Sequence, residues 1–402
     1  MTESPAIPIR PDTIAAVILG AAVPMMLAGR GWMQGSAAAA LVLVLVLAAR
    51  RRSWPSGLLS DPQSRWMAVV LAAWLPAVML SFDPIKSAET WGRVALILAG
   101  TGLLGAWLRE RPDLHAATVK AMVAVTTVAA GWAVATMTIG FVGDAPAAVL
   151  TRDVLNSYKA AASAAGCLTP VLLWGATRLR GRWRYAAVSA AILCIGVIAL
   201  TSSRSAMAGL AAGGILAGAV FAARTRRWWI GAVSTVAVAV IVLKWLLLMG
   251  PRSVNSALDT YFPVWLVDQH RQAIWQFVAG KFTESPFVGH GINVVNFLPG
   301  AHESVPGYNV EFVPSHPHNW LLELLAETGL LGTLPVVAWL GWMMQRLLRH
   351  SAMAPIAPAL AGLMGCWWGA ALFNTSFWSV WWQLTFLLLL VVAATAPAEP
   401  SR

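Results

Sequence analysis

Apolar runs of membrane length follow one another along almost the whole chain, and they constrain its fold more than any other feature. Of 402 residues, 58% are hydrophobic and only 11% are charged, whereas a soluble domain carries roughly 25% charged residues. The runs are about twenty residues long, the length at which a helix crosses a hydrocarbon core, and they lack the alternation of barrel strands. The sequence therefore predicts an all-α polytopic membrane protein.

The apolar runs between polar breaks predict about twelve transmembrane helices. They divide the chain into residues 1–249 with helices one to nine, a large polar segment at 250–318, and residues 319–402 with helices ten to twelve and a tail. No small-residue cleavage site follows the first run, which is therefore expected to stay as a helix. The predicted helices are 13–29, 36–49, 66–82, 92–108, 115–142, 155–177, 185–202, 205–222, 228–249, 319–345, 355–372 and 376–396.

Basic residues predict the orientation of these helices. Most of the 28 Lys and Arg residues lie in alternate short connections, and positive connections stay in the cytoplasm. Both termini are then cytoplasmic, and segment 250–318 is periplasmic in a bacterial inner membrane. The net charge of +11 is then an inner-leaflet anchor and not a nucleic-acid patch. Within the outer segment, apolar spacing at 263–282 predicts an amphipathic helix along the membrane surface.

Five of the seven histidines lie in the outer segment, which ends in His316-Pro317-His318-Asn319. A histidine of this kind can be a satisfied polar residue, half of a zinc site or a general base. Because helix ten is expected to begin just after His318, the positive helix end would favour a neutral imidazole that can accept a proton.

Zinc is disfavoured, and no metal site is predicted. The His316-x-His318 pair has no second cluster with convincing ligand spacing. The three cysteines, Cys167, Cys194 and Cys366, all fall inside apolar runs, where they are expected to be small packing residues.

Two outer arginines are candidate phosphate ligands. Arg204 lies in a tight Ser-Arg-Ser connection between two apolar helices, with no acidic residue near it in sequence. A guanidinium there can bind phosphate through two parallel hydrogen bonds, or can snorkel to the interface. Arg271 lies on the predicted surface helix, where it can bind substrate or pair with Asp268.

Several further polar residues have less certain roles. Arg152 and Lys159 flank the start of helix six on the outer side, with Asn156 between them, and they are weaker candidates for substrate binding. Glu323 and Glu327 lie one turn apart early in helix ten, and such acids are seldom without a function. They can orient a basic partner or line a wet cavity, and the sequence leaves both possibilities open.

The spacing around His318 resembles a known signature. His318-Asn319, nine further residues and then Gly329-Leu-Leu-Gly332 resemble the motif of O-antigen ligases, whose wider group includes O-antigen polymerases and protein O-oligosaccharyltransferases. The junction at Arg204, the stretch Arg271-Gln-Ala-Ile-Trp and the stretch Pro286-Phe-Val-Gly-His-Gly fit as well. The resemblance covers roughly 204–332. In the signature, Gly329 and Gly332 are expected to share a helix face and allow close packing.

The resemblance implies a GT-C-like fold and a role in lipopolysaccharide biosynthesis. The enzyme would transfer a polysaccharide from undecaprenyl diphosphate to a sugar hydroxyl of lipid A–core at the periplasmic face, with inversion and without a metal or other cofactor. His318 would be the base, and Arg204 and Arg271 would bind the diphosphate. The chain would act as a monomer among membrane lipids. The candidate substrate-binding residues are Arg152, Asn156, Lys159, His316 and Asn319.

Other functions remain open at this stage. An O-antigen polymerase or a protein O-oligosaccharyltransferase would share the donor and the site chemistry. A transporter of lipid-linked glycans belongs to a different class and would place its charges at mid-membrane beside broken helices. The charges singled out here gather at the outer interface, which favours chemistry at the surface.

Overall fold

The computed structural model describes residues 10–56, 61–142, 152–227, 267–350 and 355–397, together with isolated positions between 229 and 264; no side chain of 139–142 or 152–157 is included. In these ranges the chain forms twelve α-helices, two short 3₁₀ helices and no strand. The predicted all-α class is confirmed. Predicted helix nine, 228–249, falls almost entirely outside the described residues.

Seven helices in the described ranges are long and apolar enough to cross a membrane, so the chain is a multi-pass membrane protein. The number of twelve spans and their orientation stay predictions. Two shorter apolar helices are α1 (Pro11–Ala22) and α13 (Val380–Ala394). The seven long ones are α2 (Arg30–Arg51), α4 (Pro84–Arg109), α5 (Pro112–Val142), α6 (Arg152–Arg178), α7 (Arg182–Thr201), α8 (Arg204–Thr225) and α11 (Trp320–Arg349).

Prolines set several helix boundaries that the apolar runs did not predict. Helices α4 and α5 begin at Pro84 and Pro112, and α3 (Pro62–Met79) begins at Pro62, because proline suits the first helical turn. The first predicted helix, 13–29, is wrong as one element, since Pro24 begins the 3₁₀ helix η1 (Pro24–Leu27). The second predicted helix, 36–49, starts earlier, at Arg30.

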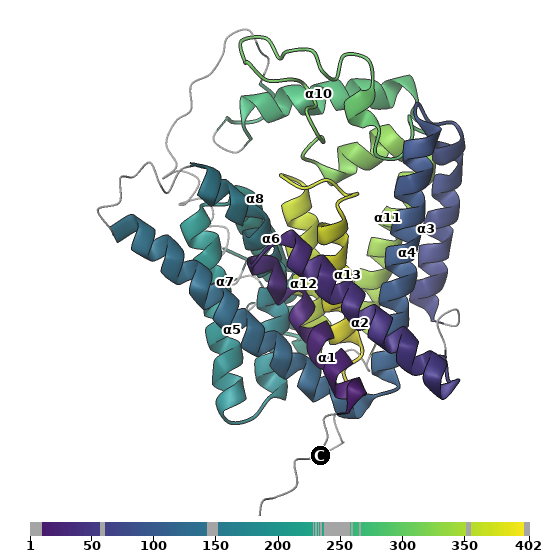
Figure 1. The fold of residues 1–402 in the computed structure, drawn as a ribbon. Helices are drawn as coiled ribbons and strands as arrows, with labels where there is room; N and C mark the ends of the chain where they lie inside the picture. The colour runs from purple at the N-terminus through teal and green to yellow at the C-terminus, as the bar shows by residue number, and fades with distance from the viewer. Residues whose placement is uncertain are drawn as a thin grey trace, which may run out of the picture. The chain divides into compact units, whose positions relative to one another are not determined.

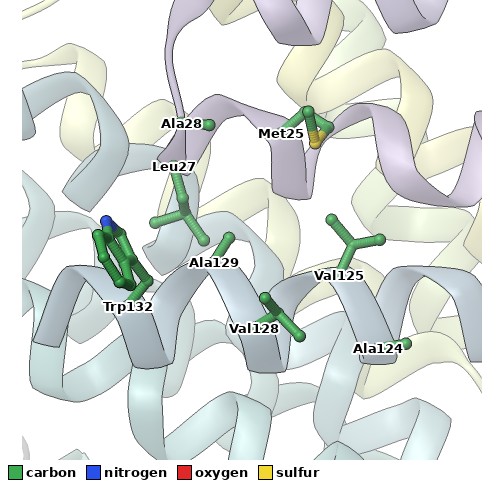
Figure 2. Close-up of a pocket in the computed structure, with 8 residues that line it drawn as sticks. All are labelled: Met25, Leu27, Ala28, Ala124, Val125, Val128, Ala129 and Trp132. Atoms are coloured by element: carbon green, nitrogen blue, oxygen red, sulfur yellow. The ribbon is translucent and has the colours of Figure 1, made fainter. Parts of the chain in front are cut away.

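The described helices fall into two compact units, of which the first comprises Met1–Leu58, Ala99–Thr201 and Leu387–Arg402. Within it α1 packs on α2 and α5, and α7 packs on α5 and α6. The Asp12 carboxylate accepts two hydrogen bonds from Arg51, at 2.8 and 2.6 Å. An apolar pocket of about 480 Å³ opens beside η1 and α5 (Figure 2). Its lining residues are Met25, Leu27, Ala28, Ala124, Val125, Val128, Ala129 and Trp132.

The second unit comprises Leu59–Leu98 and Ser202–Phe386. In it α8 packs along α12 (Ala357–Ala371), and small residues allow the two backbones to approach closely. A Cβ atom on Gly213 would lie 2.3 Å from the Cys366 Sγ atom. Cys167, Cys194 and Cys366 are all buried and free of disulfides, which confirms that they lie in packed surroundings.

The segment that contains α10 (Gln269–Glu284) and the start of α11 in the second unit has a hydrophobic core of its own. The helix predicted at 263–282 is α10, which begins several residues later. It runs crosswise to α11 and α3 (Figure 1) and packs on α11. The core joins α10, the following loop with the 3₁₀ helix η2 (Val295–Phe297), and α11. Its buried residues are Ile274, Val278, Val295, Leu298, Ala301, Val313 and Ala326.

Helix α11 is broken at Gly329, whose φ of 59° and ψ of −167° are not helical. A Cβ atom there would lie 2.3 Å from the Phe287 carbonyl carbon. The prediction that Gly329 and Gly332 share a helix face is therefore wrong, because Gly329 is not helical. Gly332 does allow close packing, against Trp74. Four backbone hydrogen bonds join the break to the loop after α10. They run from His290 N to Ala326 O (3.0 Å), Gly291 N to Glu327 O (2.9 Å), Leu330 N to Pro286 O (2.8 Å) and Leu331 N to Phe287 O (3.0 Å).

Candidate active site

His318 stands directly before α11 in a left-handed backbone conformation, with a φ of 57°. Its N–H donates to His316 Nδ1 at 3.2 Å, and the two imidazole rings lie edge to face with their centroids 4.2 Å apart. The Trp275 indole on α10 donates to the Pro317 carbonyl at 3.1 Å. Helix α10 therefore holds the turn that presents both histidines.

The ring of His318 has a defined tautomer. Its Nδ1 lies 3.1 Å from the Asn374 carbonyl oxygen. Because a carbonyl only accepts hydrogen bonds, Nδ1 must carry the proton, and Nε2 keeps a lone pair. Burial, followed by the charge of Arg271, lowers the pKa of His318 to about 4, although the Asn374 hydrogen bond acts against this shift. The imidazole is therefore neutral near pH 7 and can accept a proton at Nε2.

Asn319 has a structural function in this turn. Its Oδ1 accepts hydrogen bonds from the N–H groups of Leu321 (3.0 Å) and Leu322 (3.2 Å), which caps the N-terminus of α11. This capping explains why an asparagine follows the histidine. Substrate binding by Asn319 and by His316 stays a prediction.

Arg204 and Arg271 lie on either side of Asp268. Arg204 is the first residue of α8, and Arg271 lies in the first turn of α10. The Asp268 carboxylate is 3.7 Å from Arg204 Nη1 and 4.0 Å from Arg271 Nε. The sequence indicated no acidic residue near Arg204, and the fold supplies one from a distant segment. The pairing of Arg271 with Asp268, one of the two sequence interpretations, is present.

Electrostatic coupling links the two arginines to the histidine. Burial, assisted by the charge of Arg204, lowers the pKa of Arg271 to about 10, and the charge of Arg271 in turn acts on His318. Arg271 therefore lies near enough to His318 and to Arg204 for their charges to interact, and the catalytic roles of the three residues stay predictions. Guanidinium groups bind anions such as diphosphate through charge-assisted hydrogen bonds, so both arginines are candidate diphosphate ligands.

The candidates from helix six lie in the first unit. Helix α6 begins at Arg152, but the side chains of Arg152 and Asn156 lie outside the described residues. Lys159 is exposed. Substrate binding by these three residues stays a prediction.

The other three histidines of segment 250–318 match the interpretation as satisfied polar residues. His290 Nε2 lies 2.8 Å from the Lys281 carbonyl. On the surface, His302 Nδ1 lies 2.8 Å from a Glu311 carboxylate oxygen, and His270 Nε2 lies 3.4 Å from the Glu311 carbonyl. Among the described residues, no group of three or more His, Cys, Asp or Glu side chains is placed to hold a metal ion.

Two buried glutamates bind loops through neutral donors. Glu323 accepts hydrogen bonds from the Ser376 hydroxyl at 2.6 Å and the Phe377 N–H at 2.7 Å. One turn later, Glu327 accepts from the N–H groups of Asn293 (2.7 Å) and Val295 (3.0 Å) and from the Trp378 indole. The sequence did not predict these contacts, because no local pattern connects α11 to residues 293–295 or to residues 376–378.

The fold and site together define a multi-pass helical membrane protein in which two arginines share a carboxylate and a neutral histidine precedes a helix. Residues 189–337 match the family described as O-antigen ligase, and this segment contains Arg204, Arg271 and His318. The resemblance drawn from the sequence is thus confirmed over that segment. Residues 374–378, which contact His318 and the two glutamates, lie beyond it.

Several curated proteins, each named "Putative polysaccharide ligase", are similar to part of the chain. The Rickettsia conorii protein is 25% identical over 126 residues, which is 31% of this chain and 30% of the relative. The Rickettsia typhi protein is 26% identical over 129 residues, 31% of each chain. The Rickettsia bellii protein is 34% identical over 77 residues, 18% of this chain and 19% of the relative. Each match thus spans less than a third of the relative's length.

Proposed function

We propose that the chain is a glycan ligase of the O-antigen type, which transfers a polysaccharide from undecaprenyl diphosphate to a sugar hydroxyl of lipid A–core. The observation that carries the proposal is that His318 is a neutral base with its proton on Nδ1, and that Arg271, whose charge acts on His318, shares the Asp268 carboxylate with Arg204. A base for an incoming hydroxyl and a cationic site for a departing diphosphate are the two requirements of such a transfer.

The proposed step is a direct displacement. The acceptor hydroxyl oxygen attacks the anomeric carbon of the donor sugar, and the bond from that carbon to the diphosphate oxygen breaks on the opposite face, so the configuration inverts. The hydroxyl proton passes to Nε2 of His318. Undecaprenyl diphosphate leaves with the bonding electron pair, and Arg204 and Arg271 stabilise its charge. Release of the proton from His318 to water restores the neutral base.

Donor binding would strengthen the base. The pKa of His318 is lowered to about 4 by burial and by the charge of Arg271, which makes the imidazole a weak proton acceptor. A bound diphosphate would place negative charge near the ring, and opposite charge favours the protonated form. The pKa of His318 would therefore rise when the donor is present. Proton removal from the acceptor would then be strongest in the complete complex.

Asp268 would be displaced from its partners by the donor. Its oxygens lie 3.7 and 4.0 Å from the two guanidinium groups, which is longer than a charge-assisted hydrogen bond. Diphosphate oxygens can form shorter, paired hydrogen bonds with the two guanidinium groups. The arginines would thus be held near each other before the donor arrives.

The proposal places the reaction in a bacterial inner membrane, at its periplasmic face, with both termini in the cytoplasm. Undecaprenyl diphosphate would reach the site laterally from the outer leaflet, and α10 would cover the site at the membrane surface. The monomer would suffice, because Arg204, Arg271 and His318 all come from one chain. The alternation of basic connections supports this orientation.

The test is a lipopolysaccharide gel from cells that lack their own ligase and carry this chain with a matching donor pathway. A glycan ladder attached to lipid A–core is the expected result. Longer lipid-linked chains without attachment would identify a polymerase, and glycoprotein staining would identify a protein O-oligosaccharyltransferase. Absence of any glycan product, with the protein present in the membrane, would contradict glycan transfer.

A further inference from the structure

Two carboxylates of α11, those of Glu323 and Glu327, anchor the loop between α12 and α13. Glu323 is 1% exposed, and both of its oxygens bind this loop, through the Ser376 hydroxyl at 2.6 Å and the Phe377 N–H at 2.7 Å. The Ser376 oxygen also accepts from the Trp378 N–H at 3.2 Å. Because that oxygen accepts from one group and donates to Glu323, the carboxylate is the terminal acceptor of the network.

Further bonds fix the outgoing side of the same loop. The Gln383 amide on α13 donates to the Phe377 carbonyl at 3.0 Å. The Arg93 guanidinium on α4 lies 3.4 Å from the Trp378 carbonyl, and the Trp378 indole donates to Glu327. The backbone of 376–378 is therefore held at several points. Glu323 and Glu327 both connect it to α11, the helix that His318 precedes, and the Glu323 bonds are the ones nearer to His318 along the chain.

This loop also carries the acceptor that orients the histidine. The Asn374 carbonyl, two residues before Ser376, is 3.1 Å from His318 Nδ1. If the carbonyl moved away, the hydrogen bond that keeps the proton on Nδ1 would be lost. The ring could then carry its proton on Nε2, and a protonated nitrogen does not accept another proton from a hydroxyl. The position of one backbone carbonyl thus decides which nitrogen is basic.

We propose that Glu323 is a positioning residue that sets the tautomer of His318 through the α12–α13 loop. Glu323 and His318 lie at the start of the same helix, so the loop joins two points of one rigid element. The effect on the tautomer follows from the contacts alone. The effect on glycan transfer rests on the proposed function.

The tautomer is measured first, on the full chain in lipid nanodiscs with ¹⁵N-labelled histidine. The His318 signals are assigned by their loss in His318→Ala. The wild type is expected to show a protonated Nδ1 and an unprotonated Nε2. Glu323→Ala and the milder Ser376→Ala are expected to shift His318 toward a mixture of tautomers. Glu323→Gln, which keeps one carbonyl acceptor, is expected to lie between Glu323→Ala and the wild type.

Thr385→Val provides the matched control. The Thr385 hydroxyl is buried on α13 and donates to the Trp381 carbonyl of its own helix. Its removal deletes a buried hydroxyl, as Ser376→Ala does, without loosening the contact to Asn374. The His318 signals are expected to stay as in the wild type in this variant.

Transfer kinetics then test the consequence, with polysaccharide-linked undecaprenyl diphosphate extracted from cells as donor. Ser376→Ala is expected to lower kcat by about tenfold to a hundredfold, the cost of a misplaced catalytic group. The KM for the donor is expected to stay at the wild-type value, because Arg204 and Arg271 are untouched. A parallel loss in Thr385→Val would mark the effect as general destabilisation and contradict positioning.

The outcomes separate the two proposals. A His318 tautomer that stays unchanged in both folded Ser376→Ala and folded Glu323→Gln overturns the positioning role of Glu323, whatever the rate. A tautomer shift in a protein whose wild type transfers no glycan supports the positioning role and overturns the proposed function. If Glu323→Ala does not fold, Ser376→Ala and Glu323→Gln decide the question.

Discussion

At the scale of single residues, His318 combines a strained backbone with a fully determined ring. A φ of 57° is uncommon for a residue other than glycine, and such positions cost about 1–3 kcal/mol unless their surroundings enforce them. Here the surroundings do so, because Asn319 caps the helix that follows, Trp275 holds the Pro317 carbonyl and Asn374 holds the ring. These contacts hold both the backbone around His318 and its ring. A strained residue that its surroundings hold in this way is a strong candidate for a functional position.

The roles of several residues could be predicted from the sequence at this scale. His318 and Asn319 precede an apolar run, Arg204 has no acidic residue near it in sequence, and Arg271 lies on a predicted surface helix. Asp268 as a shared partner of both arginines, and Asn374 as the partner of His318, could not be predicted. Their contacts join segments far apart in the chain. The Asn374 contact also uses a backbone carbonyl, a group that every residue has, so the residue type gives no indication of it.

Transfer should persist in acid to an unusually low pH. The pKa of His318 in the free protein is lowered from its ordinary value of 6.5 to about 4, first by burial and then by the charge of Arg271. The neutral base is therefore present above about pH 5 and is lost as the pH falls through 4. We expect kcat/KM, which reports the free enzyme, to stay level from pH 7 to 5. An acid limb centred near pH 6.5 would contradict the environment described for His318.

Replacing an arginine of the pair by lysine should weaken donor binding although the charge is kept. In Arg271→Lys, the planar fork that bonds two diphosphate oxygens at once is lost. We expect the KM for the donor to rise about tenfold, since charge-assisted hydrogen bonds are each worth about 1.5–3 kcal/mol. Arg226→Lys, at the opposite end of α8 from Arg204 and exposed, is the control and should keep the wild-type KM. An unchanged KM in Arg271→Lys would exclude a bidentate contact from this residue.

At the scale of elements, α11 organises the site. His318 lies just before its N-terminus, its first turn carries Glu323, and its break at Gly329 receives the loop after α10. The start of α11 could be predicted, because polar residues end and an apolar run begins there. The break could not, because a glycine in an apolar helix is equally typical of close packing. Its positive φ depends on the loop 286–291, which reaches it only in the folded chain.

Gly329→Ala should be strongly destabilising. The new Cβ would lie 2.3 Å from the Phe287 carbonyl carbon in a conformation with a φ of 59°, and neither the backbone nor the loop can yield without breaking the four hydrogen bonds at the break. We expect a loss of about 2 kcal/mol or more, measured as a lower Tm in detergent or nanodiscs.

Gly341→Ala is the matched control for that experiment. Gly341 lies later in the same helix, where an added Cβ would meet nothing within 4 Å. Alanine is preferred over glycine inside a helix by about 1 kcal/mol, so the Tm should stay level or rise. An equal decrease in Tm in both variants would contradict a specific requirement for glycine at the break.

At the scale of the whole molecule, the fold class could be predicted from composition, whereas the arrangement of the site depends on contacts between distant segments. The low charge and the length of the apolar runs suffice to predict a polytopic helical protein, because a bilayer tolerates few other structures. Helix starts were less predictable, since prolines at Pro62, Pro84 and Pro112 extend helices into polar sequence that an apolar window ignores. Orientation follows from basic residues alone, and it can be tested directly.

Cysteine labelling should place α10 and the connection after α2 on opposite sides of the membrane. The three native cysteines are buried and can be replaced by alanine. Single cysteines are then introduced at Thr283, at the end of α10, and at Ser53, after α2; both positions are exposed. In intact spheroplasts, a membrane-impermeant maleimide is expected to label Thr283→Cys and to label Ser53→Cys only after lysis. Labelling of both without lysis would contradict the proposed orientation.

The most direct test of the account is a single-turnover transfer assay with purified protein, comparing wild type with His318→Ala. General-base catalysis contributes about 10²–10⁴-fold, so His318→Ala is expected to lower the transfer rate by at least about a hundredfold. Donor binding should persist, because Arg204 and Arg271 remain. His350→Ala, at the far end of α11, should transfer as the wild type does. Transfer by folded His318→Ala at the wild-type rate would show that His318 is not the base.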